Sequence, residues 1–134
     1  MSEDIEIQVR LSSHGWESRR PSARVFVDNH VIHEGVIVAP TEISWSGALE
    51  SGEHRIVVEM YNKNPDDTLT DQEGNIISDV LLNIDGVALD DIELEQLLWT
   101  HSVYRPDAQN APTELTDCVN LGWNGRWELT FSSP

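Results

Sequence analysis

A dense run of carboxylates is the feature of this 134-residue sequence best suited to do chemistry. Between Asn64 and Tyr104 there is no Lys or Arg. Carboxylates this close together repel one another, and a hard cation such as Ca²⁺, which prefers oxygen ligands, relieves the repulsion. The run therefore predicts either a calcium site or a solvated acidic surface. Its ten acidic residues are Asp66, Asp67, Asp71, Glu73, Asp79, Asp85, Asp90, Asp91, Glu93 and Glu95.

The loop expected at the start of this run, residues 62–71, is the best candidate for binding a cation. Its sequence, NKNPDDTLTD, is rich in side-chain oxygens. It is not an EF-hand, because a count from Asp67 places Gln72 where that motif needs glycine. If Ca²⁺ binds here, we expect Asp66, Asp67 and Asp71 to be its ligands. The alternative is a solvated acidic loop at one end of the domain.

The histidines and the single cysteine offer weaker metal chemistry. His30 and His33 form an H-x-x-H pair. In a strand, positions three apart point to opposite faces, so this pair is not expected to chelate zinc. Cys118 is the only cysteine, which excludes an internal disulfide, and we expect it to be a small buried residue.

Five tryptophans supply large aromatic surfaces. Trp127 alternates in phase with Leu129 and Phe131, which predicts a core position. Trp123 stands in a glycine-flanked turn, LGWNGR. Aromatic side chains exposed on such turns stack on sugar rings or anchor protein interfaces, and core packing is the alternative. The candidate ligand or interface residues are Trp16, Trp45, Trp123 and Asn62.

Motifs for catalysis are not found. The sequence has neither the G-x-S-x-G of a nucleophile elbow nor the G-x-x-x-x-G-K of a phosphate-binding loop. A carboxylate pair for glycoside hydrolysis carries no information where 24 acidic residues are available. We therefore expect a protein that is not an enzyme, and glycan hydrolysis is the least favoured hypothesis.

Alternation of apolar and polar residues predicts the strands that must position these side chains. Many short strands separated by turns predict one all-β domain over residues 1–134, an antiparallel β-sandwich or jelly roll. Asp85-Gly86 predicts a hairpin turn, residues 90–98 a short turn or helix, and residues 106–112 an exposed loop. The strands are expected at residues 5–11, 23–27, 31–38, 41–45, 54–61, 80–84, 87–89 and 127–131.

Charge narrows the range of partners. Eight basic and 24 acidic residues give a formal net charge of −16. This charge excludes nucleic-acid binding through phosphate contacts and disfavours docking on an anionic membrane. The acidic start shows no secretory signal, and no apolar run is long enough for a membrane span.

Three segments within residues 22–94 carry one family resemblance: ARVFVDNHVIHEG, SGEHRIVVEMYN and VLLNIDGVALDD. They resemble calcium-dependent xylan-binding modules, which implies a carbohydrate-binding β-sandwich that holds sugar hydroxyls through bound Ca²⁺. The acidic insertion after Asn62 departs from the family pattern. The residues that match the family's G-x-H-x-I/V-x-V strand and the asparagine after it are Gly52, His54, Ile56, Val58 and Asn62.

A second resemblance covers nearly the whole chain. It is carried by GEHRIVVEMYNKNPDDT, by NIISDVLLNIDGVALDDIEL and, most specifically, by NLGWNGRWELTF. These segments look like small virion structural proteins of T4-like tailed phages of marine hosts. The resemblance implies a multi-copy capsid-decoration, tail or fibre component, made in the host cytoplasm, that binds other virion proteins.

Two functional hypotheses follow. The leading one is a non-enzymatic virion protein that acts by binding other virion proteins. The alternative is a Ca²⁺-dependent carbohydrate-binding module that recognises host or environmental glycans. The two are compatible, since a domain on a phage surface can also contact host glycans.

Overall fold

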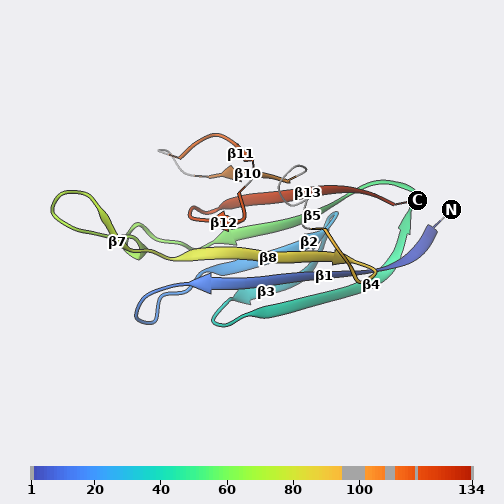
Figure 1. Ribbon diagram of the computed structural model, residues 1–134, viewed down its shortest axis with the longest axis horizontal. Coiled ribbons are helices and arrows are strands. Elements are labelled where there is room, and N and C mark those ends of the chain that lie inside the picture. The colour runs from blue at the N-terminus through green and yellow to red at the C-terminus, as the bar shows by residue number, and fades with distance from the viewer. Residues whose placement is uncertain (1, 95–101, 108–110, 117, 134) are drawn as a thin grey trace.

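Two antiparallel sheets form the body of the protein in the computed structural model, which describes residues 2–94, 102–107, 111–116 and 118–133 (Figure 1). The five-stranded sheet has the order β12-β8-β1-β4, with β9 paired to β8. The six-stranded sheet has the order β11-β10-β13-β5-β2-β3. The predicted all-β antiparallel sandwich is thus confirmed. Among the described residues, no helix is long and apolar enough to span a membrane.

The strand bounds are as follows. The five-stranded sheet contains β1 (Ser2–His14), β4 (Thr41–Glu50), β8 (Leu81–Leu89), β9 (Ile92–Glu93) and β12 (Asn120–Leu121). The six-stranded sheet contains β2 (Ser22–Val27), β3 (His30–Val36), β5 (Gly52–Tyr61), β10 (Ser102–Pro106), β11 (Leu115–Thr116) and β13 (Gly125–Ser133).

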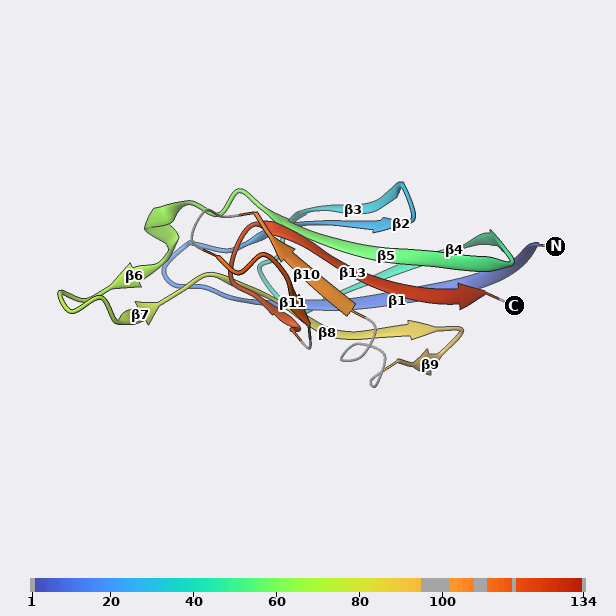
Figure 2. The ribbon, with the colours of Figure 1, turned by 90° about the horizontal axis from the view of Figure 1, so that it is seen from above.

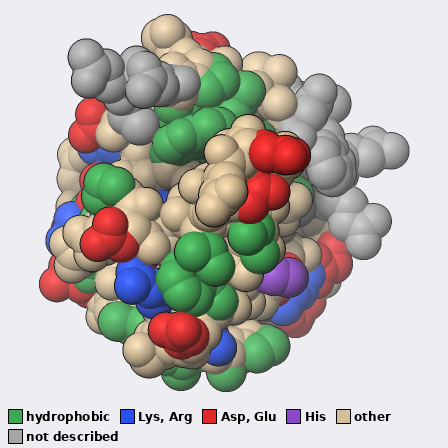
Figure 3. All heavy atoms as spheres, turned by 90° about the vertical axis from the view of Figure 1, so that its left-hand side faces the viewer, with side chains coloured by type: hydrophobic (Ala, Val, Ile, Leu, Met, Phe, Trp, Pro, Cys, Tyr) green, Lys and Arg blue, Asp and Glu red, His purple; other side chains and the backbone are tan. Residues whose placement is uncertain are grey.

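Residues 62–80 form an excursion between β5 and β8, and it contains the start of the acidic run. It consists of a short 3-10 helix, η1 (Pro65–Asp67), and a two-stranded ribbon of β6 (Leu69–Thr70) and β7 (Ile76–Ser78). The ribbon projects from the end of the sandwich opposite to the start of β1 and the end of β13 (Figures 1 and 2). Seen from this end, hydrophobic side chains lie among acidic and basic ones on the surface (Figure 3).

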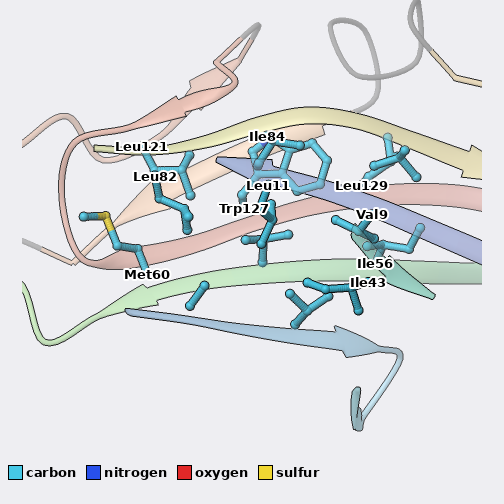
Figure 4. Close-up of a cluster of buried hydrophobic side chains, with 14 of the residues drawn as sticks. Val9, Leu11, Ile43, Ile56, Met60, Leu82, Ile84, Leu121, Trp127 and Leu129 are labelled. Carbon is cyan, nitrogen blue, oxygen red and sulfur yellow. The ribbon is translucent and has the colours of Figure 1, made fainter. Parts of the chain in front are cut away.

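The core lies between the two sheets (Figure 4). Strand alternation sends Val9 and Leu11 of β1 inward from one sheet, and Trp127 and Leu129 of β13 inward from the other. All four side chains are fully buried. Burial of each large apolar side chain contributes about 1.5–3 kcal/mol to folding. The predicted core position of Trp127 is confirmed.

The predicted hairpin at Asp85-Gly86 is wrong, because β8 runs straight through both residues. Strand β1 pairs Arg10 with Gly86 and Leu11 with Ile84, so Asp85 is the extra residue of a β-bulge. A Cβ on Gly86 would lie 2.0 Å from the Arg10 guanidinium, so the end of this flexible side chain would have to move to admit a larger residue at the bulge. The Asp-Gly pair therefore marks a bulge, and the neighbouring strand determines which of the two structures forms.

For residues 90–98 the sequence leaves a short turn or a helix open, and the turn is what forms where the structure describes this segment. Asp90 and Asp91 have φ angles of 50° and 67° and form a tight turn. This turn reverses β8 into the short strand β9, and two residues with positive φ are typical of hairpin turns. Residues 95–98 of the expected turn or helix and residues 108–110 of the expected loop lie outside the described residues.

Candidate functional site

A cavity of about 630 Å³ lies between the excursion and the turn that joins β12 to β13. Its wall combines one exposed aromatic ring with charged groups and side-chain amides. Cavities of this size with a few placed polar groups are the usual form of a small-ligand site. The lining residues are Lys63, Asn64, Pro65, Thr68, Ile76, Asp79, Leu81, Asp107, Asn120, Gly122, Trp123 and Asn124.

Trp123 is exposed because it stands at the centre of the β12–β13 turn, outside the alternation that buries Leu121 and Trp127. The residue is 38% exposed. The turn lies close against β10, where a Cβ on Gly125 would be 2.5 Å from the Arg105 carbonyl oxygen. The glycine that follows the turn thus brings β13 against β10 and leaves the indole at the cavity.

Tyr104 of β10 fixes this turn from inside the core. Its buried hydroxyl donates to the Trp123 carbonyl oxygen and accepts from the Trp123 N–H at 3.0 Å. Burial raises the pKa of the Tyr104 hydroxyl. The group therefore remains protonated and able to donate at physiological pH.

Lys63 lies in the cavity wall with its side chain only 9% exposed. Its Nζ donates to Asp79 Oδ1 at 2.7 Å and to the Gly122 carbonyl oxygen at 2.5 Å. Asn124 fixes its main chain: the Lys63 N–H donates to Asn124 Oδ1 at 2.9 Å, and Asn124 Nδ2 donates to the Lys63 carbonyl oxygen at 3.0 Å. Hydrogen bonds thus fix Lys63 at both its ammonium group and its main chain.

Asp79 is the carboxylate at the centre of the cavity wall. Besides the Lys63 ammonium, its Oδ1 accepts from the Thr68 hydroxyl at 2.7 Å and from the Val80 N–H at 2.8 Å. Three donors therefore converge on one oxygen. This oxygen has little capacity left to coordinate a metal ion, and Oδ2 is the oxygen of Asp79 to which the described residues donate no hydrogen bond.

The three predicted Ca²⁺ ligands are not brought together. Asp67 is buried at the base of the excursion, where its Oδ2 accepts from the Asn64 N–H and its Oδ1 from the Arg19 guanidinium, both at 2.8 Å. Burial disfavours its charge, but these donors outweigh that effect and hold its pKa below the ordinary value. Asp66 is exposed on η1.

Asp71 lies at the tip of the ribbon, between β6 and β7. Its Oδ1 accepts from the N–H groups of Asn75 and Glu73 at 2.9 Å, and these bonds lower its pKa. The carboxylate therefore closes the turn of the ribbon. Nowhere in the described part of the chain do three or more His, Cys, Asp or Glu side chains form a group that could hold a metal ion.

Of the other candidate residues, Trp123 alone lines this cavity. Trp16 is half-buried, donates its Nε1 to the Asp67 carbonyl oxygen at 2.7 Å and lies 4.5 Å beneath the Arg19 guanidinium. It anchors the excursion. Trp45 lines a separate cavity of about 340 Å³ near the turns that follow β2 and β4.

Asn62 lies in an adjoining hollow of about 490 Å³ on the six-stranded sheet. Its φ of 63° turns the chain out of β5 into the excursion. This hollow shares Asp107 and Asn124 with the Trp123 cavity. A ligand longer than the first cavity can therefore extend over these two residues toward Asn62.

The sequence interpretation did not identify four residues of this site: Lys63, Asp79, Tyr104 and Asn124. One signal was available, because Lys63 is the only lysine among eight basic residues. The other three stand in ordinary contexts. Their roles arise from hydrogen bonds between segments far apart in the chain, such as the bonds between Lys63 and Asn124.

Two solved structures are similar to this fold. One is vCBM60 in complex with galactobiose, which is 17% identical with a TM-score of 0.56 and covers 95% of this chain and 97% of that chain. The other is the selenomethionine form of vCBM60, 16% identical with a TM-score of 0.59, covering 93% and 89%. That structure was described as part of the finding that a circular permutation provides an evolutionary link between two families of calcium-dependent carbohydrate-binding modules.

These likenesses show that the chain shares the β-sandwich fold of a carbohydrate-binding module, as the resemblance to xylan-binding modules implies. No family model and no curated protein matches the sequence. The expected likeness to phage virion proteins, the virion partners and the virion location therefore stay predictions.

Proposed function

We propose that this chain is a non-catalytic glycan-binding module and that the Trp123 cavity is its binding site. The observation that carries the proposal is the exposed indole in one cavity with the amide residues Asn64 and Asn120. An aromatic ring offers a stacking surface for the C–H face of a sugar. The amides both donate and accept hydrogen bonds, as the hydroxyls of a sugar do.

The rigidity of the cavity also supports glycan binding. Tyr104 fixes the backbone of Trp123, and the Asp107 N–H donates to the Asn124 carbonyl oxygen at 2.6 Å. A wall formed before the ligand arrives loses little conformational entropy on binding. The adjoining hollow near Asn62 gives space for a second sugar unit.

The fold likeness favours this proposal, because vCBM60 was solved in complex with galactobiose. Calcium dependence is named for such modules, but the described residues of this chain form no group of three or more His, Cys, Asp or Glu side chains that could hold a metal ion. Asp67, Asp71 and Asp79 are each engaged by donors of the chain itself. We therefore assign no step of glycan binding to Ca²⁺.

Calorimetric titration of the protein with galactobiose and with xylo-oligosaccharides tests the proposal. We expect saturable binding to at least one of these probes. Truncation of an aromatic side chain at the centre of a binding site costs about 2 kcal/mol or more. We therefore expect Trp123→Ala to raise the Kd about thirtyfold.

Trp45→Ala is the matched control, because it removes the same type of side chain from a different cavity. It should bind the probe as the wild type does, provided that circular dichroism shows it to be folded. Equal binding by wild type and Trp123→Ala would contradict the proposed site. No binding of any probe by the wild type would contradict the proposed function.

A further inference from the structure

We propose that the ammonium of Lys63 is the cation of this site and that glycan binding in the Trp123 cavity needs no divalent metal ion. The inference rests on the proposed function and specifies how the site works. Calcium dependence is named for the two families of carbohydrate-binding modules with which vCBM60 is described, and this proposal departs from it.

The oxygen atoms around Lys63 are of the kind that a hard cation selects. The ammonium contacts one carboxylate oxygen, from Asp79, and one main-chain carbonyl oxygen, from Gly122. Carboxylates and carbonyls are the usual protein ligands of Ca²⁺. In this chain a covalently attached positive charge occupies that environment.

The position of the charge is fixed before any ligand binds. Asn124 bonds both main-chain groups of Lys63, and the same residue belongs to the turn that presents Trp123. The ammonium and the indole are therefore held by one connected unit. Movement of either group would disturb the other.

One donor of Lys63 is available to a ligand. An ammonium has three N–H donors. Two of them bond Asp79 and Gly122, and the described residues supply no partner for the third. Because Lys63 lines the cavity beside Trp123, a sugar hydroxyl that lies on the indole can accept this third hydrogen bond.

A divalent ion would have to compete with this arrangement. It would share Asp79 with the ammonium, and like charges at such short range repel each other. The second inward-facing carboxylate of the excursion, Asp67, is already paired with Arg19 at 2.8 Å. Both carboxylates are thus neutralised by cations of the chain.

A metal titration without glycan is the first part of the test. Wild-type protein is melted with and without millimolar CaCl₂ at matched ionic strength, with EDTA as the reference. Tb³⁺ emission excited through tryptophan gives a second readout. We expect no saturable shift in Tm and no saturable emission. A saturable Ca²⁺-dependent increase in Tm would overturn the inference.

The second part is calorimetry with galactobiose or the xylo-oligosaccharide that binds, in EDTA and in CaCl₂. We expect the same Kd in both buffers. Because Lys63→Met removes a hydrogen bond from a charged donor, it should weaken binding at least about tenfold. Arg55→Met is the control, because it removes a cation that is 56% exposed and does not line this cavity.

Lys63→Met leaves Asp79 without its cation and can fail to fold for that reason. The double variant Lys63→Met with Asp79→Asn removes both charges and should fold while still binding weakly. Unchanged glycan affinity in this double variant would overturn the role of Lys63. Wild-type binding that occurs only with CaCl₂ would overturn the inference and leave the proposed function standing. No binding in either buffer would overturn both.

Discussion

The hydroxyl of Tyr104 bonds both main-chain groups of Trp123, accepting from the N–H at 3.0 Å and donating to the carbonyl oxygen. Tyr104 is fully buried and Trp123 is 38% exposed, so this pair connects the core directly to the cavity. Trp123 lies in the turn between β12 and β13, outside the backbone pairing of either strand. Its conformation therefore depends on a side chain from β10.

Tyr104→Phe should lower both stability and glycan affinity. The substitution removes one oxygen and leaves two main-chain groups without their partner, and each unsatisfied group costs about 1–3 kcal/mol. We expect a smaller free energy of unfolding in urea and a higher Kd in calorimetry. Tyr61→Phe is the control for the unfolding measurement only, because the Tyr61 hydroxyl makes no hydrogen bond among the described residues but the residue lines the hollow near Asn62. If the two variants behave alike, Tyr104 does not order the site.

Strands with clean alternation could be predicted from the sequence, and those that depend on a neighbour could not. Strands β1, β2, β5 and β13 follow their apolar pattern, and each buries the expected face. The bulge at Asp85 could not be predicted because it exists only through the register of β8 on β1. At Asp90 the sequence leaves a turn and a helix open, because the apolar residues after it do not alternate, and the structure forms the turn.

The candidate site was predicted only through Trp123. The acidic run has no basic residue within it, and that observation suggested a bound cation. The structure supplies the positive charges from outside the run: Arg19 to Asp67, and Lys63 to Asp79. Such pairings depend on tertiary contacts, which local spacing does not reveal.

Trp16→Phe should loosen the excursion without unfolding the sandwich. The change removes the bond from the indole Nε1 to the Asp67 carbonyl oxygen and keeps an aromatic ring beneath Arg19. Few core side chains lie in the excursion, so local opening has a lower free energy than global unfolding. Faster amide hydrogen exchange over residues 64–79, with a nearly unchanged Tm, is the expected outcome.

Trp45→Phe serves as the control for that experiment, because the Trp45 indole makes no hydrogen bond within the described part of the chain and lines a different cavity. Exchange over residues 64–79 should then match the wild type. Equal exchange rates in Trp16→Phe and wild type would show that the indole bond does not anchor the excursion.

His54 should make stability depend on pH. Its Nε2 lies 2.6 Å from the Glu50 carbonyl oxygen and its Nδ1 lies 2.8 Å from Asp28 Oδ2. Both nitrogens face acceptors, so the imidazolium is favoured, and the pKa of His54 is raised by Glu50 first and by Asp28 second. A raised folded-state pKa gives stability that is complete below the unfolded value of about 6.5 and is lost as pH rises through the folded value.

Thermal unfolding between pH 6 and pH 9 measures this effect. The Tm advantage of wild type over His54→Gln should be largest at the acidic end and should shrink as the pH rises. His14→Gln, at an exposed position, is the control and should follow the wild-type profile. A constant difference between wild type and His54→Gln across this range would contradict the assignment.

The two glycines that flank the Trp123 turn should respond differently to alanine. A Cβ on Gly125 would lie 2.5 Å from the Arg105 carbonyl oxygen and 2.7 Å from the Pro106 Cα, and main chain cannot move aside as a flexible side chain does. Gly125→Ala should therefore push β13 away from β10. Overpacking of this kind costs about 1–3 kcal/mol, and glycan affinity should fall with it because Trp123 shifts.

Gly122→Ala is the matched substitution, since its Cβ would meet only the Leu81 side chain at an ordinary 3.4 Å. A compatible glycine-to-alanine change restricts the unfolded chain and stabilises by at most about 1 kcal/mol. Urea unfolding of the two variants should therefore give opposite signs for the change in stability. Calorimetry is used only for Gly125→Ala, where binding should be lost, because Gly122 itself lines the cavity and accepts from Lys63. Similar losses in both would mean that conformational freedom of the turn, rather than its contact with β10, presents the indole to the ligand.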